Sequence, residues 1–229
     1  MTLNDNDIVI TSTGASVDFS STIVSGSATP RALTIAQGAG TVTITGNIGG
    51  TASNDLGNIT IGATGNDGAI TFSGDIGTDS VAGAAIVAVG NAGTSSITLG
   101  GAEYNTSGTQ TYTADDYNLN GTDITFTTSA DIVTFADGGS DGSIDLADAA
   151  DLSITTSGAN IVINVPILGT SGGGVSTDVT LNAAAGNVTI EDIGTDVNDV
   201  AITGGTISID GTIETADLST SDAGGITLT

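Results

Sequence analysis

The chemistry available to this chain of 229 residues comes almost entirely from its acids, because 26 Asp and Glu face a single base, Arg31. Hard cations such as Ca²⁺ bind several carboxylate and carbonyl oxygens. The spacing Asp137-Gly-Gly-Ser-Asp141-Gly-Ser-Ile-Asp145 makes Asp137, Asp141 and Asp145 the candidate calcium ligands. This stretch has neither the closing Glu of an EF-hand nor a Gly-Gly-x-Gly-x-Asp repeat. Two interpretations stay open: a weak calcium site, or turns in which Asp bonds its own backbone.

The three tyrosines form the second candidate site. Tyr104, Tyr112 and Tyr117 fall within one stretch of the middle of the chain. Tyr suits surfaces that are apolar at one end and wet at the other, so the three could form a platform for a sugar or a neighbouring chain. The alternative interpretation is that they cover a bulge or one end of the core.

Catalysis is not expected. The chain has no His and no Cys, and its only base is an Arg. The adjacent acids Asp115-Asp116 and Glu191-Asp192 would point to opposite faces of a strand, whereas glycoside hydrolysis needs two carboxylates across one bond. Thr-x-Thr runs such as Thr41-Val-Thr43-Ile-Thr45 could bind ice or another crystal surface if they lay in register, but they are unevenly spaced. Thr is also simply a good outward strand residue.

The charge excludes two classes of partner. The formal net charge is −25. Nucleic acid and anionic membrane surfaces both need clustered Lys and Arg, so we expect neither as a partner. No apolar run is long enough to cross a bilayer, so membrane insertion is not expected. No cofactor is implied beyond the weak calcium site.

The elements that would position these residues are short strands in a repeat. The phrase Gly40-Thr-Val-Thr-Ile-Thr-Gly-Asn-Ile-Gly49 returns as Gly68-Ala-Ile-Thr-Phe-Ser-Gly-Asp-Ile-Gly77, and runs such as Val42-Thr-Ile44 alternate aliphatic and polar residues. That period of two predicts half-buried strands, and Gly, Asn and Asp mark the turns. Adjacent strand gaps sum to one coil of ~20–28 residues, which predicts a parallel β-helix or β-solenoid of roughly 8–11 coils. We expect one all-β domain over residues 1–229, whether complete or a segment of a longer repetitive protein.

The cadence of these strands resembles a known family. The runs Gly57-Asn-Ile-Thr-Ile61, Gly68-Ala-Ile-Thr-Phe-Ser-Gly-Asp-Ile-Gly77, Ser96-Ile-Thr-Leu-Gly-Gly101 and 104–128 are similar to the repeat regions of large secreted bacterial adhesins of the filamentous-haemagglutinin type. The resemblance implies a right-handed coil, export to the cell surface, and a stalk or adhesive role. It supplies no catalytic motif.

Three functions follow as expectations. The first is a non-enzymatic extracellular shaft on a bacterial surface, which could present or contact surface glycans or proteins. The second is a self-assembling subunit of a fibre or sheath, whose coils pair end to end with those of neighbouring subunits. The third is a carbohydrate-binding module that uses the tyrosine stretch.

Overall fold

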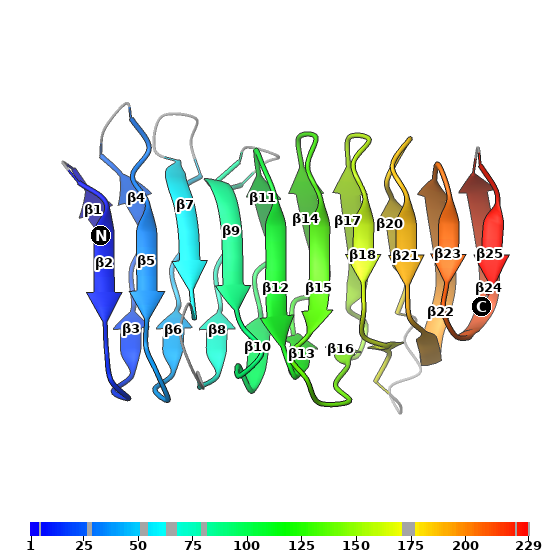
Figure 1. The fold of residues 1–229 in the computed structure, drawn as a ribbon, viewed down its shortest axis with the longest axis horizontal. Coiled ribbons are helices and arrows are strands. Elements are labelled where there is room, and N and C mark those ends of the chain that lie inside the picture. The colour runs from blue at the N-terminus through cyan, green and yellow to red at the C-terminus, as the bar shows by residue number, and fades with distance from the viewer. Residues whose placement is uncertain are drawn as a thin grey trace.

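The computed structural model describes residues 1–4, 6–26, 29–50, 55–62, 68–78, 82–170, 177–222 and 224–228. Within these residues every regular element is a β-strand, and the strands pair in parallel with strands of the neighbouring coils. The strands wind into a single stacked coil (Figure 1). The predicted parallel β-solenoid is therefore confirmed.

Each coil has three faces, which we name face A, face B and face C. Face A consists of β2 (Ile8–Thr11), β5 (Leu33–Ala36), β7 (Leu56–Ile61), β9 (Ala84–Gly90), β12 (Gln110–Ala114), β15 (Val133–Asp137), β18 (Ile161–Ile163), β21 (Val188–Ile190), β23 (Ile207–Ile209) and β25 (Ile226–Leu228). Both β7 and β9 begin at the corner before this face.

Faces B and C complete the coil. Face B consists of β3 (Val17–Phe19), β6 (Val42–Ile44), β8 (Ile70–Phe72), β10 (Ser96–Leu99), β13 (Asp116–Leu119), β16 (Ile144–Leu146), β19 (Ile167–Leu168) and the first residues of β22 (Ile193–Gly204) and β24 (Ile213–Asp222). Face C consists of β1 (Thr2–Leu3), β4 (Val24–Ser25), β11 (Glu103–Thr106), β14 (Asp123–Thr128), β17 (Asp151–Thr156), β20 (Val179–Asn182) and the later residues of β22 and β24. Isolated bridges through Ile48 and Ile76 continue face C between β4 and β11.

The ladder on face A is unbroken from the first coil to the last. Its register runs from Ile8 to Leu33 and onward to Ile207 and Ile226, in nine coil-to-coil steps. A coil takes 28 residues between Ile59 and Val87 but only 19 between Val188 and Ile207, as the residue numbers show. At ~4.8 Å a step, the described ladder is ~43 Å long.

The coil is right-handed. In Figure 1 the nearer strands of face A point down, the strands of face B behind them point up, and the chain advances from left to right. Seen along the coil axis from the N-terminal end, the chain therefore turns clockwise as it moves away, which is the path of a right-handed helix. This is the hand expected when strands with a right-handed twist connect in parallel.

The core is a set of aliphatic columns inside the coil. Alternate residues of each strand point inward, as in β5, where Leu33 and Ile35 are buried while Thr34 and Ala36 are half-buried. The columns run through every face, and the largest side chains buried in them are Phe72, Tyr104, Tyr112, Tyr117, Phe126 and Phe135. Each fully buried aliphatic side chain contributes roughly 1.5–3 kcal/mol of transfer free energy. A narrow coil therefore acquires a core without the large side chains of a globular protein.

Candidate functional site

The three tyrosines lie inside the coil and not on its surface. Tyr104 is on β11, Tyr112 on β12 and Tyr117 on β13, and each side chain is 0% exposed. An aromatic platform for a sugar needs an open ring face, so these residues do not form one in this structure. The alternative interpretation is that they cover a bulge or one end of the core. The three rings instead lie within the core itself, in the middle of the stack of coils.

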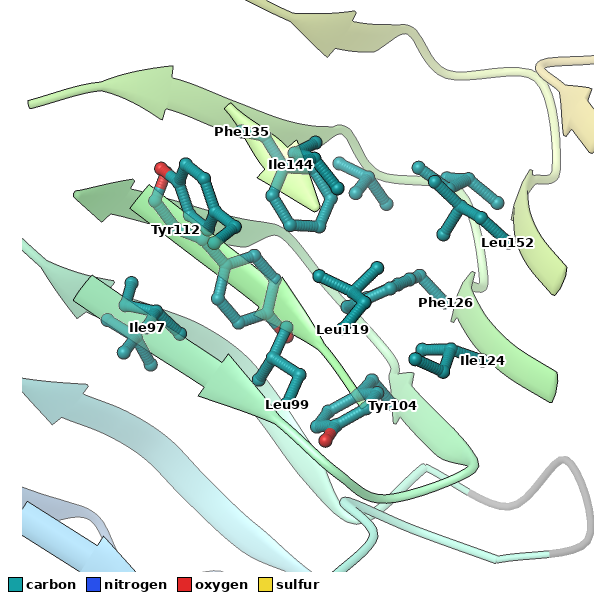
Figure 2. Packing of buried hydrophobic residues seen from close by; sticks show 14 of the residues in the cluster. Ile97, Leu99, Tyr104, Tyr112, Leu119, Ile124, Phe126, Phe135, Ile144 and Leu152 are labelled. Atoms are coloured by element: carbon teal, nitrogen blue, oxygen red, sulfur yellow. The ribbon is translucent and has the colours of Figure 1, made fainter. Parts of the chain in front are cut away.

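The tyrosines pack with two phenylalanines of the next coil. Tyr104 is in register with Phe126 and stacks on it at a centroid distance of 4.9 Å. Tyr112 stacks in the same way on Phe135 at 5.1 Å, and the two Phe rings meet edge to face at 5.1 Å. Figure 2 shows these rings between the aliphatic columns. Such pairs add ~0.5–1.5 kcal/mol each beyond their buried area, so the rings stabilise this part of the core.

A buried glutamine connects the tyrosines to the backbone. The Gln110 amide group donates to the carbonyl oxygens of Tyr104 at 2.8 Å and Thr127 at 2.9 Å, and its oxygen accepts the Tyr112 hydroxyl at 3.1 Å. Gln110 is 0% exposed and occupies an inward position that other coils fill with an aliphatic residue. Because each of its polar atoms is paired, burial does not leave an uncompensated group.

Burial also sets the ionisation of the tyrosines. The loss of hydration raises the pKa of all three hydroxyls above the ordinary value of 10.0. The Gly101 N–H, 3.0 Å from the Tyr104 hydroxyl, and the Ala114 N–H, 2.9 Å from that of Tyr117, oppose part of this rise. The hydroxyls are therefore protonated at neutral pH. Those of Tyr112 and Tyr117 donate to Gln110 and to backbone carbonyl oxygens, whereas that of Tyr104 accepts the Gly101 N–H.

The calcium candidates are exposed, and only two of them lie together. Asp137 and Asp141 line one surface hollow of about 220 Å³ with Glu191, while Asp145 on β16 is not among its lining residues. Asp137 accepts the Gly139 N–H at 2.8 Å, and Asp145 accepts the Ser143 hydroxyl at 2.7 Å. These are the local bonds that Asp makes in turns. No group of three or more His, Cys, Asp or Glu within the described residues is arranged to hold a metal ion. Weak calcium binding stays a prediction.

Glu191 lies among other carboxylates at this corner of the coil, and they affect its pKa. Partial burial raises its pKa, and the neighbouring carboxylates of Asp192, Asp137, Asp210 and Asp141 raise it further. Each of these charges favours the neutral form of Glu191 because like charges repel. The corner therefore has an uncompensated negative potential that would attract cations in general.

Sequence reasoning missed a regular file of acids on face C. The motif Asp-aliphatic-Thr/Ser/Ala-apolar-Thr/Asn recurs in four consecutive face C strands, and Asp217 continues the register, so that five successive coils each place one carboxylate in the same file. The file consists of Asp123, Asp151, Asp178, Asp199 and Asp217. Copies of this motif stand in the sequence at 123–127, 151–155, 178–182 and 199–203, but the variable spacing between them hides the repeat.

The acids and amides at the corners have a structural role. Their side-chain oxygens accept backbone N–H groups of the next coil: Asp151 accepts from Asp178 at 2.9 Å, and Asp178 accepts from Asp199 at 3.1 Å. Asp75 and Asn160 do the same at other corners. A carboxylate can only accept, so it fits positions where the turning backbone leaves donors outside the strand ladder. These bonds tie successive coils together.

Comparison with known proteins gives no family assignment for this chain. No protein-family model, curated protein or solved structure matches this chain. Among the described residues no helix is long and apolar enough to cross a membrane. The arrangement therefore offers a continuous core, a ladder of backbone bonds, and a surface whose acids differ from face to face.

Proposed function

We propose that this chain is a rigid, non-enzymatic β-helical shaft of an extracellular protein on a bacterial surface, of the adhesin type that its repeats resemble. The observation that supports this proposal is the unbroken ladder on face A, which passes through nine coil steps without a change of register. A rod of ~43 Å with one core along its length resists bending because every coil is bonded to both neighbours.

The acids suit this role. Several coils contribute a carboxylate that accepts a backbone N–H group of the following coil, and these carboxylates are those of Asp7, Asp75, Asp151, Asp178 and Asp192. The remaining negative charge keeps such a surface soluble. Glycans or proteins at the cell surface would then be partners of the parent molecule that the shaft holds at a distance.

Rigidity can be measured directly because the chain has no Cys. Spin labels on Val9→Cys and Thr227→Cys would mark the first and last coils of face A, and both positions are exposed and point outward. A shaft gives one narrow distance distribution near ~43 Å. A broad distribution would show that the coils move independently, and the proposal would fail. Labels at Thr34 and Thr60, one coil apart, provide the short-distance control.

A second candidate is a subunit that stacks end to end into a fibre or sheath. Its support is that coils dock on one another by the same parallel backbone pairing throughout the ladder, so coils of two molecules could pair in this way. Light scattering in chelator and then in millimolar calcium tests it. Growth to elongated species supports stacking, whereas a constant mass of 22.0 kDa opposes it.

A further inference from the structure

The acids of this chain are distributed unequally among the three faces. Face C has its in-register file of carboxylates, and the outward column of face B includes Asp18 and Asp145. Face A differs, because the central outward column of its ten strands has no charged residue. That column consists of Val9, Thr34, Thr60, Ala88, Thr111, Thr134, Val162, Thr189, Ser208 and Thr227.

The columns on either side of it are nearly neutral as well. Towards the start of each strand the outward residues include Asn58 and Ile86, and towards the end they include Thr113 and Ala136. The apolar side chains reach solvent, since Val9 is 69% and Ile86 38% exposed. The acids at the edges of face A are Asp7 in the first coil, the exposed Asp137 at the end of β15 near the middle of the ladder, and Glu191 and Asp210 towards its last coils. Figure 1 shows the strands of face A side by side along the whole coil.

The size of face A is that of a protein interface. Strands of about five residues are ~17 Å wide and nine steps are ~43 Å long, so the face covers ~700 Å². A standard interface buries ~800 Å² on each partner, with charged residues depleted at its centre and a polar rim. Face A has this composition, because its centre is neutral and its acids are at the rim.

Charge then selects the partner. Two molecules with a formal charge of −25 each repel unless the acids stay apart. With sheets ~10 Å apart inside each coil and ~10 Å apart across the contact, the face B and face C acids of two copies that meet through face A are separated by ~30 Å, well beyond the Debye length of ~8 Å in physiological salt. Contact through face C would instead bring two files of carboxylates together.

We propose that face A is the docking surface for a second copy of this chain, which pairs with it face to face about a twofold axis. A twofold that reverses the order of the coils places Glu191 and Asp210 of one copy opposite the neutral first coils of the other. The rim acid Asp137, at the end of β15 near the middle of the ladder, lies close to the same edge of the second copy and contributes to the remaining repulsion. Apolar contact and threonine hydroxyls hold the pair, and added salt strengthens it by screening the remaining repulsion. The proposal is independent of the shaft function, because a single shaft needs no partner.

The test is sedimentation equilibrium over a range of protein concentrations, at low and physiological salt. We expect the mass to rise from 22.0 kDa towards twice that value, and more readily in salt. Thr111→Asp places an acid at the middle of face A, and twofold symmetry brings in two, so the dimer dissociation constant should rise roughly tenfold or more. Thr98→Asp is the matched control, since Thr98 is a half-buried outward residue of β10 on face B.

Each outcome decides the proposal. Dimers that Thr111→Asp weakens and Thr98→Asp leaves intact support it, provided that circular dichroism shows both variants folded. A mass of 22.0 kDa at every concentration overturns it, as does equal weakening by the two variants. Species larger than dimers that are insensitive to Thr111→Asp also overturn it, and they point to end-to-end stacking instead.

Discussion

Asp178, a member of the acid file on face C, affects the stability of the fold in two opposing ways. Its Oδ1 atom accepts the Asp199 N–H and the Asn198 side-chain amide, both at 3.1 Å. At the same time Asp178 is in register with Asp151 in one neighbouring coil and Asp199 in the other. The acceptor stabilises the fold, whereas the charge destabilises it. Replacing Asp178 by Asn and by Ala separates the two.

The magnitudes decide the order of stability. Two like charges ~5 Å away in water each cost ~0.8 kcal/mol, or about half of that after screening in physiological salt, so removing the Asp178 charge gains ~1 kcal/mol. A bond to a half-buried carboxylate contributes ~1–2 kcal/mol. Asp178→Asn retains an acceptor oxygen and should be more stable than the natural chain by ~0.5–1 kcal/mol, while Asp178→Ala should lie ~1–2 kcal/mol below Asp178→Asn.

Urea unfolding followed by circular dichroism measures both differences, at low and at high salt. The advantage of Asp178→Asn should shrink in high salt because it is electrostatic, while the gap between Asn and Ala should persist. Equal midpoints for the two variants would refute the acceptor role. An Asn variant less stable than the natural chain at low salt would refute the repulsion.

Three further predictions concern the core and the corners. Gly90 has a φ of +81°, and an added Cβ would lie 2.0 Å from the Thr113 carbonyl oxygen. Gly90→Ala should therefore lower the free energy of unfolding by more than ~2 kcal/mol, measured by thermal unfolding. The control Gly100→Ala should be tolerated, because its Cβ would meet its nearest atom at 3.4 Å. Tyr112→Phe removes the donor to the buried Gln110 oxygen and should lower the free energy of unfolding by ~1–3 kcal/mol. Adding Tyr112→Phe to a Gln110→Met background should cost less than it does in the natural chain if the unpaired oxygen is the cause, and an equal cost in the two backgrounds would contradict it. The pKa of each of the three core tyrosines is raised in the fold, so above pH ~10 the unfolded chain loses these protons before the folded chain does. The free energy of unfolding should therefore fall as the pH rises, by at most ~4 kcal/mol per pH unit for the three groups together. Denaturant midpoints that do not change between pH ~9 and ~11 would contradict this coupling.

The repeat and its alternation were readable from the sequence because each strand carries its own signal. In Val42-Thr-Ile44 and Ile70-Thr-Phe72 the side-chain period of two is complete within three residues, and both pairs of inward side chains are buried. The register between coils was not readable, because coils of 19 to 28 residues shift the motifs relative to one another. The acidic file on face C and the neutral column on face A both depend on that register.

The candidate sites show the same division. The sequence alone determined that any chemistry here rests on carboxylates, threonines and three tyrosines, and that short strands carry them. Only the tertiary structure decided which side of the coil each occupies. Tyr104 and Tyr117 look like wet surface aromatics by residue type, yet phenylalanine rings pack against them and backbone donors bond their hydroxyls inside the core. Residue type fixes what a side chain can bond, whereas burial and register, which involve residues a whole coil away, fix what it does bond.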